Sequence, residues 1–409
     1  MEVIMKSYQR FLEYVKIDTT SNPNSKTQPS SPGQKILGSM LVQEMKNIGI
    51  KDAKMDGYGY VYGTIPSNID KKVDTIGFIA HMDTSCDMPG DNIKPRIIYD
   101  YDGKSVKLND DVILDVNQFP FLVDLKGESL IVTDGTTLLG ADNKAGIAEI
   151  MTMAEIIMNS PDIKHGTIKI AFTPDEEIGE GTMFFDIDGF NCDYAYTVDG
   201  GKEGSIEFEN FNAASATVTI NGVNIHPGTA KGKMVNSIEI GYEFHNLLPQ
   251  FLKPAYTEKY EGFNHLNEIS GNVEKTVLKY IIRNHDINKF NKQKEDFLNI
   301  QNFINQKYGP KTCILDIKDS YFNMYEYLKD KMEIVEIAKK AITNVGLTPI
   351  INPIRGGTDG AMLTYKGLPC PNLGTGGYNF HGRYECITIE GMDRALSVLL
   401  EIVRLVAEK

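Results

Sequence analysis

Residues 75–84 have the sequence Thr75-Ile76-Gly77-Phe78-Ile79-Ala80-His81-Met82-Asp83-Thr84. The first part is an apolar run with β-branched and aromatic side chains, which is typical of a buried β-strand. His81 and Asp83 follow at its carboxyl end, and in an extended chain residues two apart point the same way. This spacing suits an imidazole metal ligand whose second ring nitrogen is oriented by a carboxylate. By itself the pair also fits the commoner case of a surface histidine beside an aspartate.

Two further strand candidates run into acidic side chains in the same manner. Residues 166–172 precede Thr173-Pro174-Asp175-Glu176-Glu177, and residues 194–198 precede Asp199. Because ligands of open α/β sheets bind outside the carboxyl ends of the strands, we expect these acids to converge with His81. Glu176 and Glu177 can project in different directions, one to bind metal and the other to handle protons; a solvated charged loop is the alternative.

The remaining candidate ligands lie at a helix start and in a glycine-rich loop. Residues 144–158 are apolar almost all round, which predicts a buried helix, and Asp142 stands just ahead of it. A simple N-cap role and a ligand role fit Asp142 equally well. His381 lies in the glycine-rich residues 374–382.

This inventory of two histidines and three carboxylates, with Glu176 left over, suits a two-metal hydrolase; the candidate ligands are His81, Asp142, Glu177, Asp199 and His381. Two divalent ions bring a charge of about +4, three carboxylates bring about −3, and a bridging hydroxide closes the balance. Two imidazoles favour zinc, or cobalt or manganese in its place, over magnesium or calcium.

The organisation of the chain predicts two domains. Its 409 residues exceed what one hydrophobic core usually supports. The first half alternates helical and strand signals, as expected of an α/β sheet covered by helices. From about residue 210 the order becomes strand, helix, strand, helix, strand, which indicates a self-contained α+β unit. We therefore expect a first domain formed by residues 1–209 and 321–409, with residues 210–320 inserted into it.

Bulk properties exclude several classes of partner. The net charge is −13 and the basic residues are scattered, so no nucleic-acid footprint is present. No apolar run approaches the ~20 residues that span a bilayer, and the first residues lack signal-peptide order. The five cysteines form no CxxC pair. Together these features predict a cytoplasmic protein with reduced thiols that binds neither nucleic acid nor membrane.

Four longer strings carry a resemblance to a known family. They are His81-Met82-Asp83-Thr84, Thr173-Pro174-Asp175-Glu176-Glu177-Ile178-Gly179, Asn224-Ile225-His226-Pro227-Gly228-Thr229-Ala230-Lys231-Gly232-Lys233-Met234-Val235-Asn236 and Arg355-Gly356-Gly357-Thr358-Asp359-Gly360. Together with the ligand inventory, they resemble the co-catalytic zinc peptidases, a family that includes carboxypeptidase G, bacterial dipeptidases and amino-acid deacylases. The resemblance covers essentially the whole chain and is greatest to the tripeptide-specific aminopeptidases of that family.

The resemblance implies a fold and a metal centre. The fold is a mixed-sheet α/β zinc-peptidase catalytic domain with an inserted smaller α+β, ferredoxin-like lid domain. His81 and Asp199 would hold one zinc ion, Glu177 and His381 would hold the other, and Asp142 would bridge both.

The resemblance also implies roles for five residues outside the ligand set. Asp83 would orient His81, and Glu176 would be the general base that takes a proton from the bridging water. His226, from the inserted domain, would stabilise the oxyanion. Arg283 and Arg355 would bind substrate at its terminal carboxylate.

The implied activity is hydrolysis of the N-terminal residue from tripeptides. A dipeptidase, a carboxypeptidase or an amino-acid deacylase of the same fold remains open, because function resides in the walls of a site. A non-catalytic peptide- or metal-binding protein is an alternative from another class. Relatives in the family often form homodimers through the inserted domain, although no clear interface stripe is present in this sequence.

Overall fold

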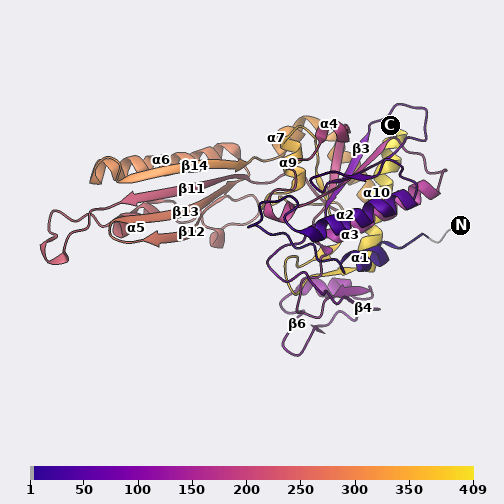
Figure 1. The fold of residues 1–409 in the computed structure, drawn as a ribbon, viewed down its shortest axis with the longest axis horizontal. Helices are drawn as coiled ribbons and strands as arrows, with labels where there is room; N and C mark the ends of the chain where they lie inside the picture. The colour runs from indigo at the N-terminus through magenta and orange to yellow at the C-terminus, as the bar shows by residue number, and fades with distance from the viewer. Residues whose placement is uncertain (1–3) are drawn as a thin grey trace. The chain divides into compact units, whose positions relative to one another are not determined.

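The computed structural model describes residues 4–409, which form two compact units. The first unit contains the residues up to Phe208, together with Tyr327–Asn352 and Thr358–Lys409. The second unit contains Glu209–Glu326 and the short segment Pro353–Gly357. Figure 1 shows the helices and strands of both units. The ranges expected from the sequence place residues 353–357 in the first domain, whereas these residues group with the second unit in the structure.

A mixed eight-stranded sheet forms the centre of the first unit. Its strands are, in spatial order, β1 (Lys54–Met55), β2 (Val61–Ile65), β8 (Ile168–Thr173), β3 (Ile76–His81), β9 (Tyr194–Val198), β16 (Asn372–Leu373), β10 (Ser205–Glu207) and β15 (Ile350–Ile351). β3 runs parallel to both β8 and β9, and all of its residues are buried. A strand covered on both faces is expected to be continuously apolar, which is why the sequence predicted this region well.

Helices pack against this sheet and against one another. They are α1 (Ser7–Tyr14), α2 (Pro32–Asn47), α3 (Ala141–Asn159), α4 (Ile187–Phe190), α7 (Tyr325–Leu328), α8 (Glu333–Asn344), α9 (Asp359–Tyr365) and α10 (Ile389–Glu408). Short 3₁₀ turns of this unit are η1 (Pro120–Leu125), η2 (Glu176–Ile178) and η5 (Lys329–Lys331), whereas η3 (Pro227–Thr229) and η4 (Pro254–Tyr256) belong to the second unit. α3 is buried nearly all round, as predicted, and contacts α1, α10 and β3. None of the described helices combines the length and apolar character needed to cross a bilayer.

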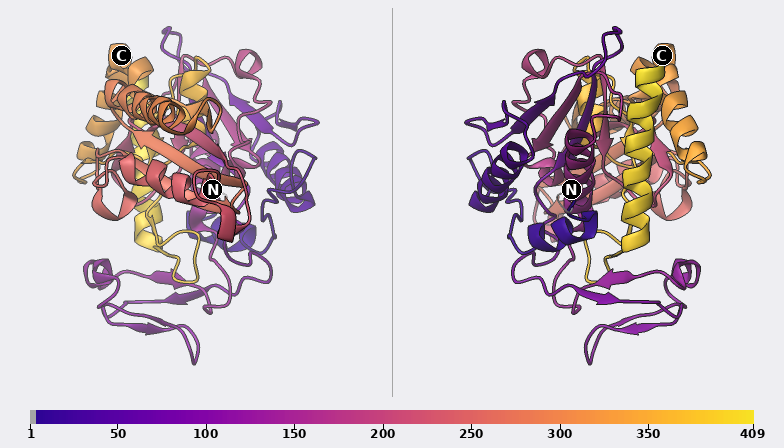
Figure 2. Two further views of the ribbon diagram at one scale, coloured as in Figure 1. Left: turned by 90° about the vertical axis from the view of Figure 1, so that its left-hand side faces the viewer. Right: turned by 90° about the vertical axis from the view of Figure 1, so that its right-hand side faces the viewer.

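A second, smaller sheet in the first unit was not predicted. Its strand order is β17 (Gly377–Tyr378), β18 (Cys386–Thr388), β7 (Leu130–Val132) and β4 (Arg96–Ile98), and the hairpin β5 (Val106–Lys107) and β6 (Ile113–Leu114) lies beyond it (Figure 2). Its strands are too short to show a period in the sequence. The loop between β17 and β18 carries His381, so this sheet positions a candidate ligand.

The second unit is a four-stranded antiparallel sheet with two helices on one face (Figure 1). Along the chain its elements are β11 (Asn212–Asn221), α5 (Ser237–Leu247), β12 (Phe263–Gly271), β13 (Lys275–Asn284), α6 (Ile287–Tyr308) and β14 (Cys313–Tyr321). This β-α-β-β-α-β order is ferredoxin-like and confirms the predicted fold class. The sequence missed β12, a largely exposed edge strand whose polar residues hide its alternation.

Glu149 on α3 is a buried acid that the predicted site does not use. It is fully buried, and neither carboxyl oxygen has a hydrogen-bond partner among the described residues. Burial, with smaller contributions from Glu203 and Asp393, raises the pKa of Glu149 well above its usual value. The folded chain therefore holds it protonated, whereas the unfolded chain releases the proton near pH ~4.3.

The raised pKa predicts a pH-dependent stability. The contribution of Glu149 is fully present below its unfolded pKa and is lost as pH rises toward its folded pKa. We expect Glu149→Gln to flatten the fall in melting temperature between pH 5 and pH 8, and Glu149→Met to stabilise the protein at pH 8 by about 1–3 kcal/mol. Calorimetry across this range is the measurement, with the half-exposed Glu13→Gln as control. Parallel curves for the parent and Glu149→Gln would contradict the prediction.

Candidate metal centre

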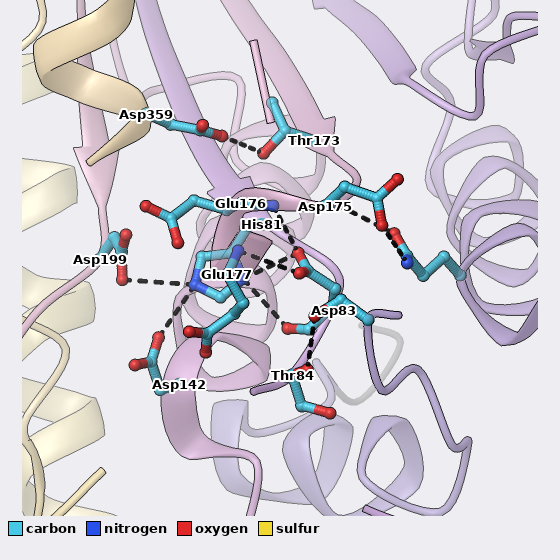
Figure 3. A network of polar contacts seen from close by, with 12 residues as sticks. His81, Asp83, Thr84, Asp142, Thr173, Asp175, Glu176, Glu177, Asp199 and Asp359 are labelled. Atoms are coloured by element: carbon cyan, nitrogen blue, oxygen red, sulfur yellow. Dashed lines mark hydrogen bonds and ion pairs between the residues drawn. The ribbon is translucent and has the colours of Figure 1, made fainter. Parts of the chain in front are cut away.

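Three parallel strands bring the candidate residues to one edge of the central sheet. His81 at the end of β3 pairs with Thr173 at the end of β8, and Ile79 pairs with Thr197 on β9. Asp199 therefore lies at the level of His81 on the neighbouring strand. The turn after Thr173 carries Glu176 and Glu177, so the convergence expected from the strand ends is present (Figure 3).

His81, Asp142 and Asp199 form the first group of candidate ligands. Nε2 of His81 lies 2.9 Å from Oδ1 of Asp142 and 3.7 Å from Oδ1 of Asp199. Burial lowers the pKa of His81, but the neighbouring carboxylates outweigh it and raise that pKa well above its usual value. The two carboxylates thus form an anionic environment that favours the protonated, positively charged form of the His81 imidazole.

Asp142, Glu177 and His381 form the second group. Nε2 of His381 lies 3.2 Å from Oδ2 of Asp142 and 3.0 Å from Oε2 of Glu177. These two hydrogen bonds raise the pKa of His381 to about 11. Because the two oxygens of Asp142 face different histidines, this single carboxylate belongs to both groups.

The donor sets fit two divalent cations. The ligand atoms of each group lie within 4.8 Å of one another, and every one is an imidazole nitrogen or a carboxylate oxygen. Oε1 of Glu177 is buried and has no hydrogen-bond partner among the described residues. This oxygen is therefore available to bind a metal ion. Cations bound here would replace the protons that the imidazoles otherwise hold.

Asp83 holds two parts of the site together. Nδ1 of His81 lies 3.3 Å from Oδ1 of Asp83 and 3.0 Å from the backbone carbonyl oxygen of Asp83. The same carboxylate accepts hydrogen bonds from the backbone N–H groups of Glu176 and Glu177, at 3.0 and 3.1 Å. The sequence gave no signal for these two hydrogen bonds, which depend on how the turn after β8 folds back.

Glu176 lies beside both groups without belonging to either. Burial raises the pKa of Glu176 well above its usual value, and the charges of Asp359, Asp199 and Glu177 add to this effect. In Figure 3 its carboxyl group occupies the space between Asp199 and Asp359. The position is that of a group that can hold or release a proton next to the ligands.

Comparison with known proteins shows the family. The model of Peptidase family M20/M25/M40 matches residues 133–405. The chain belongs to this family. Two of its relatives are Peptidase T of Bacillus licheniformis, 52% identical over 99% of both chains, and Peptidase T of Halothermothrix orenii, 54% identical over 99% of this chain and 100% of the relative.

Solved structures share the fold of this M20/M25/M40 member. A tripeptidase from Staphylococcus aureus has a TM-score of 0.77 at 24% identity and covers 99% of this chain and 98% of its own. The aminopeptidase PepT from Bacillus cereus has the same TM-score and identity and covers 98% of each chain. A dinuclear metal-binding peptidase from Bacillus subtilis has a TM-score of 0.65 at 13% identity, covering 98% of this chain and 99% of its own.

Glu385 supports the candidate metal centre of this M20/M25/M40 member, and the sequence analysis missed it. It is buried and accepts hydrogen bonds from the backbone N–H groups of Leu139 at 2.6 Å, Gly140 at 2.8 Å and Asp142 at 3.0 Å. The backbone at Asp142 and Asn143 is not helical, so the regular part of α3 begins after them. Glu385 therefore holds the turn that presents the shared carboxylate.

Asp175 is a second missed carboxylate. It adopts a left-handed backbone conformation with φ 58° at the start of η2. Its Oδ2 accepts a hydrogen bond from the backbone N–H of Ser30 at 2.7 Å, and its Oδ1 accepts one from Nε2 of Gln34 at 2.7 Å. Asp175 thus anchors the Glu176 turn to α2. An acid that bonds to residues so distant in sequence leaves no local pattern.

The three predicted substrate-binding residues all lie in the second unit. His226 is exposed in the loop after β11, and its Nδ1 accepts a hydrogen bond from the backbone N–H of Gly228 at 3.1 Å. Arg283 on β13 donates to the backbone carbonyls of Ala214 and Ile282, at 3.2 and 3.0 Å, and lies over the ring of Tyr321.

Arg355 is attached to the loop that precedes β12. Its guanidinium donates to the backbone carbonyls of Lys259 at 2.6 Å, Glu261 at 3.1 Å and Thr257 at 3.4 Å. It also lies over the rings of two phenylalanines, 5.0 Å from the centroid of Phe211 and 5.7 Å from that of Phe263. These contacts give Arg355 a structural task within the second unit.

We expect Arg355→Ala to destabilise the second unit by about 2–4 kcal/mol, through lost cation–π contacts and carbonyls without donors. Arg355→Lys keeps the charge but loses the planar fork, and it should recover only part of this stability. Hydrogen exchange of backbone amides in β11 and β12 measures the effect locally. If these amides exchange equally slowly in the parent and in Arg355→Ala, the structural role of Arg355 is wrong and substrate binding is its only proposed role.

Proposed function

We propose that the protein is a two-zinc aminopeptidase that removes the N-terminal residue from tripeptides. The observation that carries the proposal is the pair of histidine–carboxylate groups joined by Asp142, with Glu176 free beside them. Support for the substrate class comes from relatives named Peptidase T, which match 99% of this chain at 52–54% identity. The acyl-transfer chemistry of such a site requires an activated water and a proton carrier, and the groups present suit both.

In this proposal the two groups hold one zinc ion each. His81 and Asp199 would hold the first, Glu177 and His381 would hold the second, and Asp142 would contribute to both. When bound, the ions supply Lewis acidity toward the peptide carbonyl and toward water. Zinc is favoured by the imidazole–carboxylate donor set, and cobalt or manganese would substitute for it.

Glu176 acts as the general base. Its carboxylate takes a proton from the attacking water and later gives that proton to the leaving amine nitrogen. Burial suits this task because it favours the protonated form after the first transfer. Asp83 keeps the turn in place through the N–H groups of Glu176 and Glu177, so the base has a fixed position during both transfers.

His226 is proposed to donate a hydrogen bond to the oxyanion. Its Nδ1 accepts from the N–H of Gly228, so in the neutral ring the proton resides on Nε2, which is free to donate. Arg283 and Arg355 are proposed to bind the terminal carboxylate of the substrate. Among the described residues, both guanidinium groups donate hydrogen bonds to neutral backbone and hydroxyl oxygens and form no ion pair with a carboxylate.

The substrate class is tested with one set of peptides. The zinc-loaded protein is incubated with a tripeptide, its N-acetylated form and the corresponding dipeptide, and the released amino acid is identified by mass spectrometry. We expect the N-terminal residue to be released from the free tripeptide alone. Release of a C-terminal residue, or equal cleavage of the acetylated peptide, contradicts aminopeptidase activity; faster cleavage of the dipeptide indicates a dipeptidase.

We propose further that the protein is a cytoplasmic homodimer. None of the five cysteines is in a disulfide, which suits a reducing compartment. The edge strands β12 and β14 of the second unit each leave one side of their backbone unpaired within the sheet, and a second copy could pair with such an edge. Sedimentation velocity over a range of concentrations tests the dimer, and a monomer throughout contradicts it.

A further inference from the structure

A buried carboxylate that the proposed mechanism does not use lies against the turn of the general base. Asp359 is the first residue of α9 and is 5% exposed. Its Oδ2 accepts a hydrogen bond of 2.6 Å from Oγ1 of Thr173, the last residue of β8 (Figure 3). Thr173 is also where the chain leaves the sheet to form the turn with Glu176. Asp359 therefore holds the beginning of this turn.

The same carboxylate presses on the end of the turn. A β-carbon at Gly181 would lie 2.2 Å from Oδ1 and 2.6 Å from Oδ2 of Asp359, so the glycine α-carbon packs directly on the carboxylate. Residues 174–180, including Glu176, thus lie between two points that both contact Asp359. The backbone N–H groups in the middle of the turn are held separately by Asp83.

The start of α9 is itself fixed, so Asp359 cannot easily withdraw from the turn. Oγ1 of Thr358 accepts a hydrogen bond of 3.1 Å from the N–H of Ala361, which caps the helix. A β-carbon at Gly360 would lie 2.3 Å from Oδ1 of Asn372 and 2.7 Å from Oγ1 of Thr197, so the helix start packs directly on β16 and β9. Asp359 consequently fixes the turn relative to the central sheet.

We infer that Asp359 is a positioning residue for Glu176: it braces both ends of the catalytic turn and so fixes the distance between the general base and the metal centre. The inference rests on the proposed function, because it concerns the base of that reaction. Asp359 touches neither ligand group in this role, and its effect on turnover passes through Thr173 and Gly181. Loss of the brace lets the turn shift, and shifts of about 1 Å in a catalytic group lower turnover by about 100-fold.

The test uses Asp359→Ala, Thr173→Val and Thr173→Ser in the zinc-loaded protein. Asp359→Ala removes the acceptor of the contact and Thr173→Val removes its donor. We expect each of these two variants to lower kcat by about 10- to 100-fold, with KM and bound zinc nearly unchanged. Thr173→Ser keeps the hydroxyl and should retain most of the activity. Because both losses pass through one contact, the double variant should lose about as much as the more strongly affected single variant.

Several outcomes would overturn the inference. A loss confined to KM, additive losses in the double variant, or equal activity of Thr173→Val and Thr173→Ser would each show that the contact does not position the base. Should Asp359→Ala fail to fold, Gly181→Ala serves in its place, because the added methyl displaces the carboxylate without removing it. If the parent protein releases no N-terminal residue from any tripeptide, the proposed function itself is wrong. If the parent is active and Asp359→Ala is equally active, only the inference is wrong.

Discussion

Glu176→Gln keeps both metal ions and lowers kcat by about 100- to 10,000-fold, the usual contribution of a positioned general base. The amide has nearly the shape of the carboxyl group, so packing in the turn is preserved, yet it cannot accept a proton from water. Glu176 belongs to neither ligand group, which is why metal content should not change. Elemental analysis of the dialysed variant and steady-state kinetics on a tripeptide give the two quantities.

Glu180→Gln is the matched control for this prediction. Glu180 belongs to the same loop and lies outside both ligand groups, so its amide variant should retain both metal ions and most of the activity. Full turnover by Glu176→Gln would refute the general-base role. Loss of an ion from that variant would instead move Glu176 into the ligand set.

Asp142→Asn has the second largest expected effect because it weakens both metal sites together. Asp142 supplies one oxygen to each group, so its loss leaves two protein ligands on either side. Most catalytic zinc sites use three protein ligands. We expect bound zinc to fall from about two ions per chain to well below one, with turnover lost in parallel.

Single-group variants provide the comparison. His81→Ala and His381→Ala each remove a ligand from one group, so each should keep about one ion. Metal also stabilises the folded state that binds it. A chelator should therefore lower the melting temperature of the parent strongly and that of Asp142→Asn hardly at all. Two retained ions in Asp142→Asn would show that the groups do not share this ligand.

The sequence predicted the parts of the fold that show a clear hydrophobic pattern. β3, β8, β9 and α3 are largely buried and mostly apolar, and each was placed within a few residues. The small second sheet consists of strands of two or three residues, which carry no period. β12 was hidden by its exposed, polar face. The fold class could therefore be predicted from the sequence, whereas the small second sheet and the edge strand β12 could not.

The candidate site shows the same division. The five candidate ligands follow strands or flank a glycine-rich loop, and such positions can be recognised locally. The supporting carboxylates cannot: Glu385 bonds to residues 243–246 positions earlier in the chain, and Asp359 bonds to Thr173, 186 positions away. Their partners are backbone N–H groups and a hydroxyl, which any sequence could supply. The precision of the site thus comes from long-range contacts that only the folded chain reveals.

The segment Pro353–Gly357 determines when the second unit can finish folding during synthesis. The second unit cannot complete its contacts from residues 209–326 alone, because Arg355, which donates to three carbonyls of the loop before β12 and covers Phe211 and Phe263, comes later in the chain. A nascent chain that has emerged from the ribosome only as far as residue 326 therefore carries this loop without its donor. Final closure of the second unit has to wait until translation has passed well into the returning part of the first.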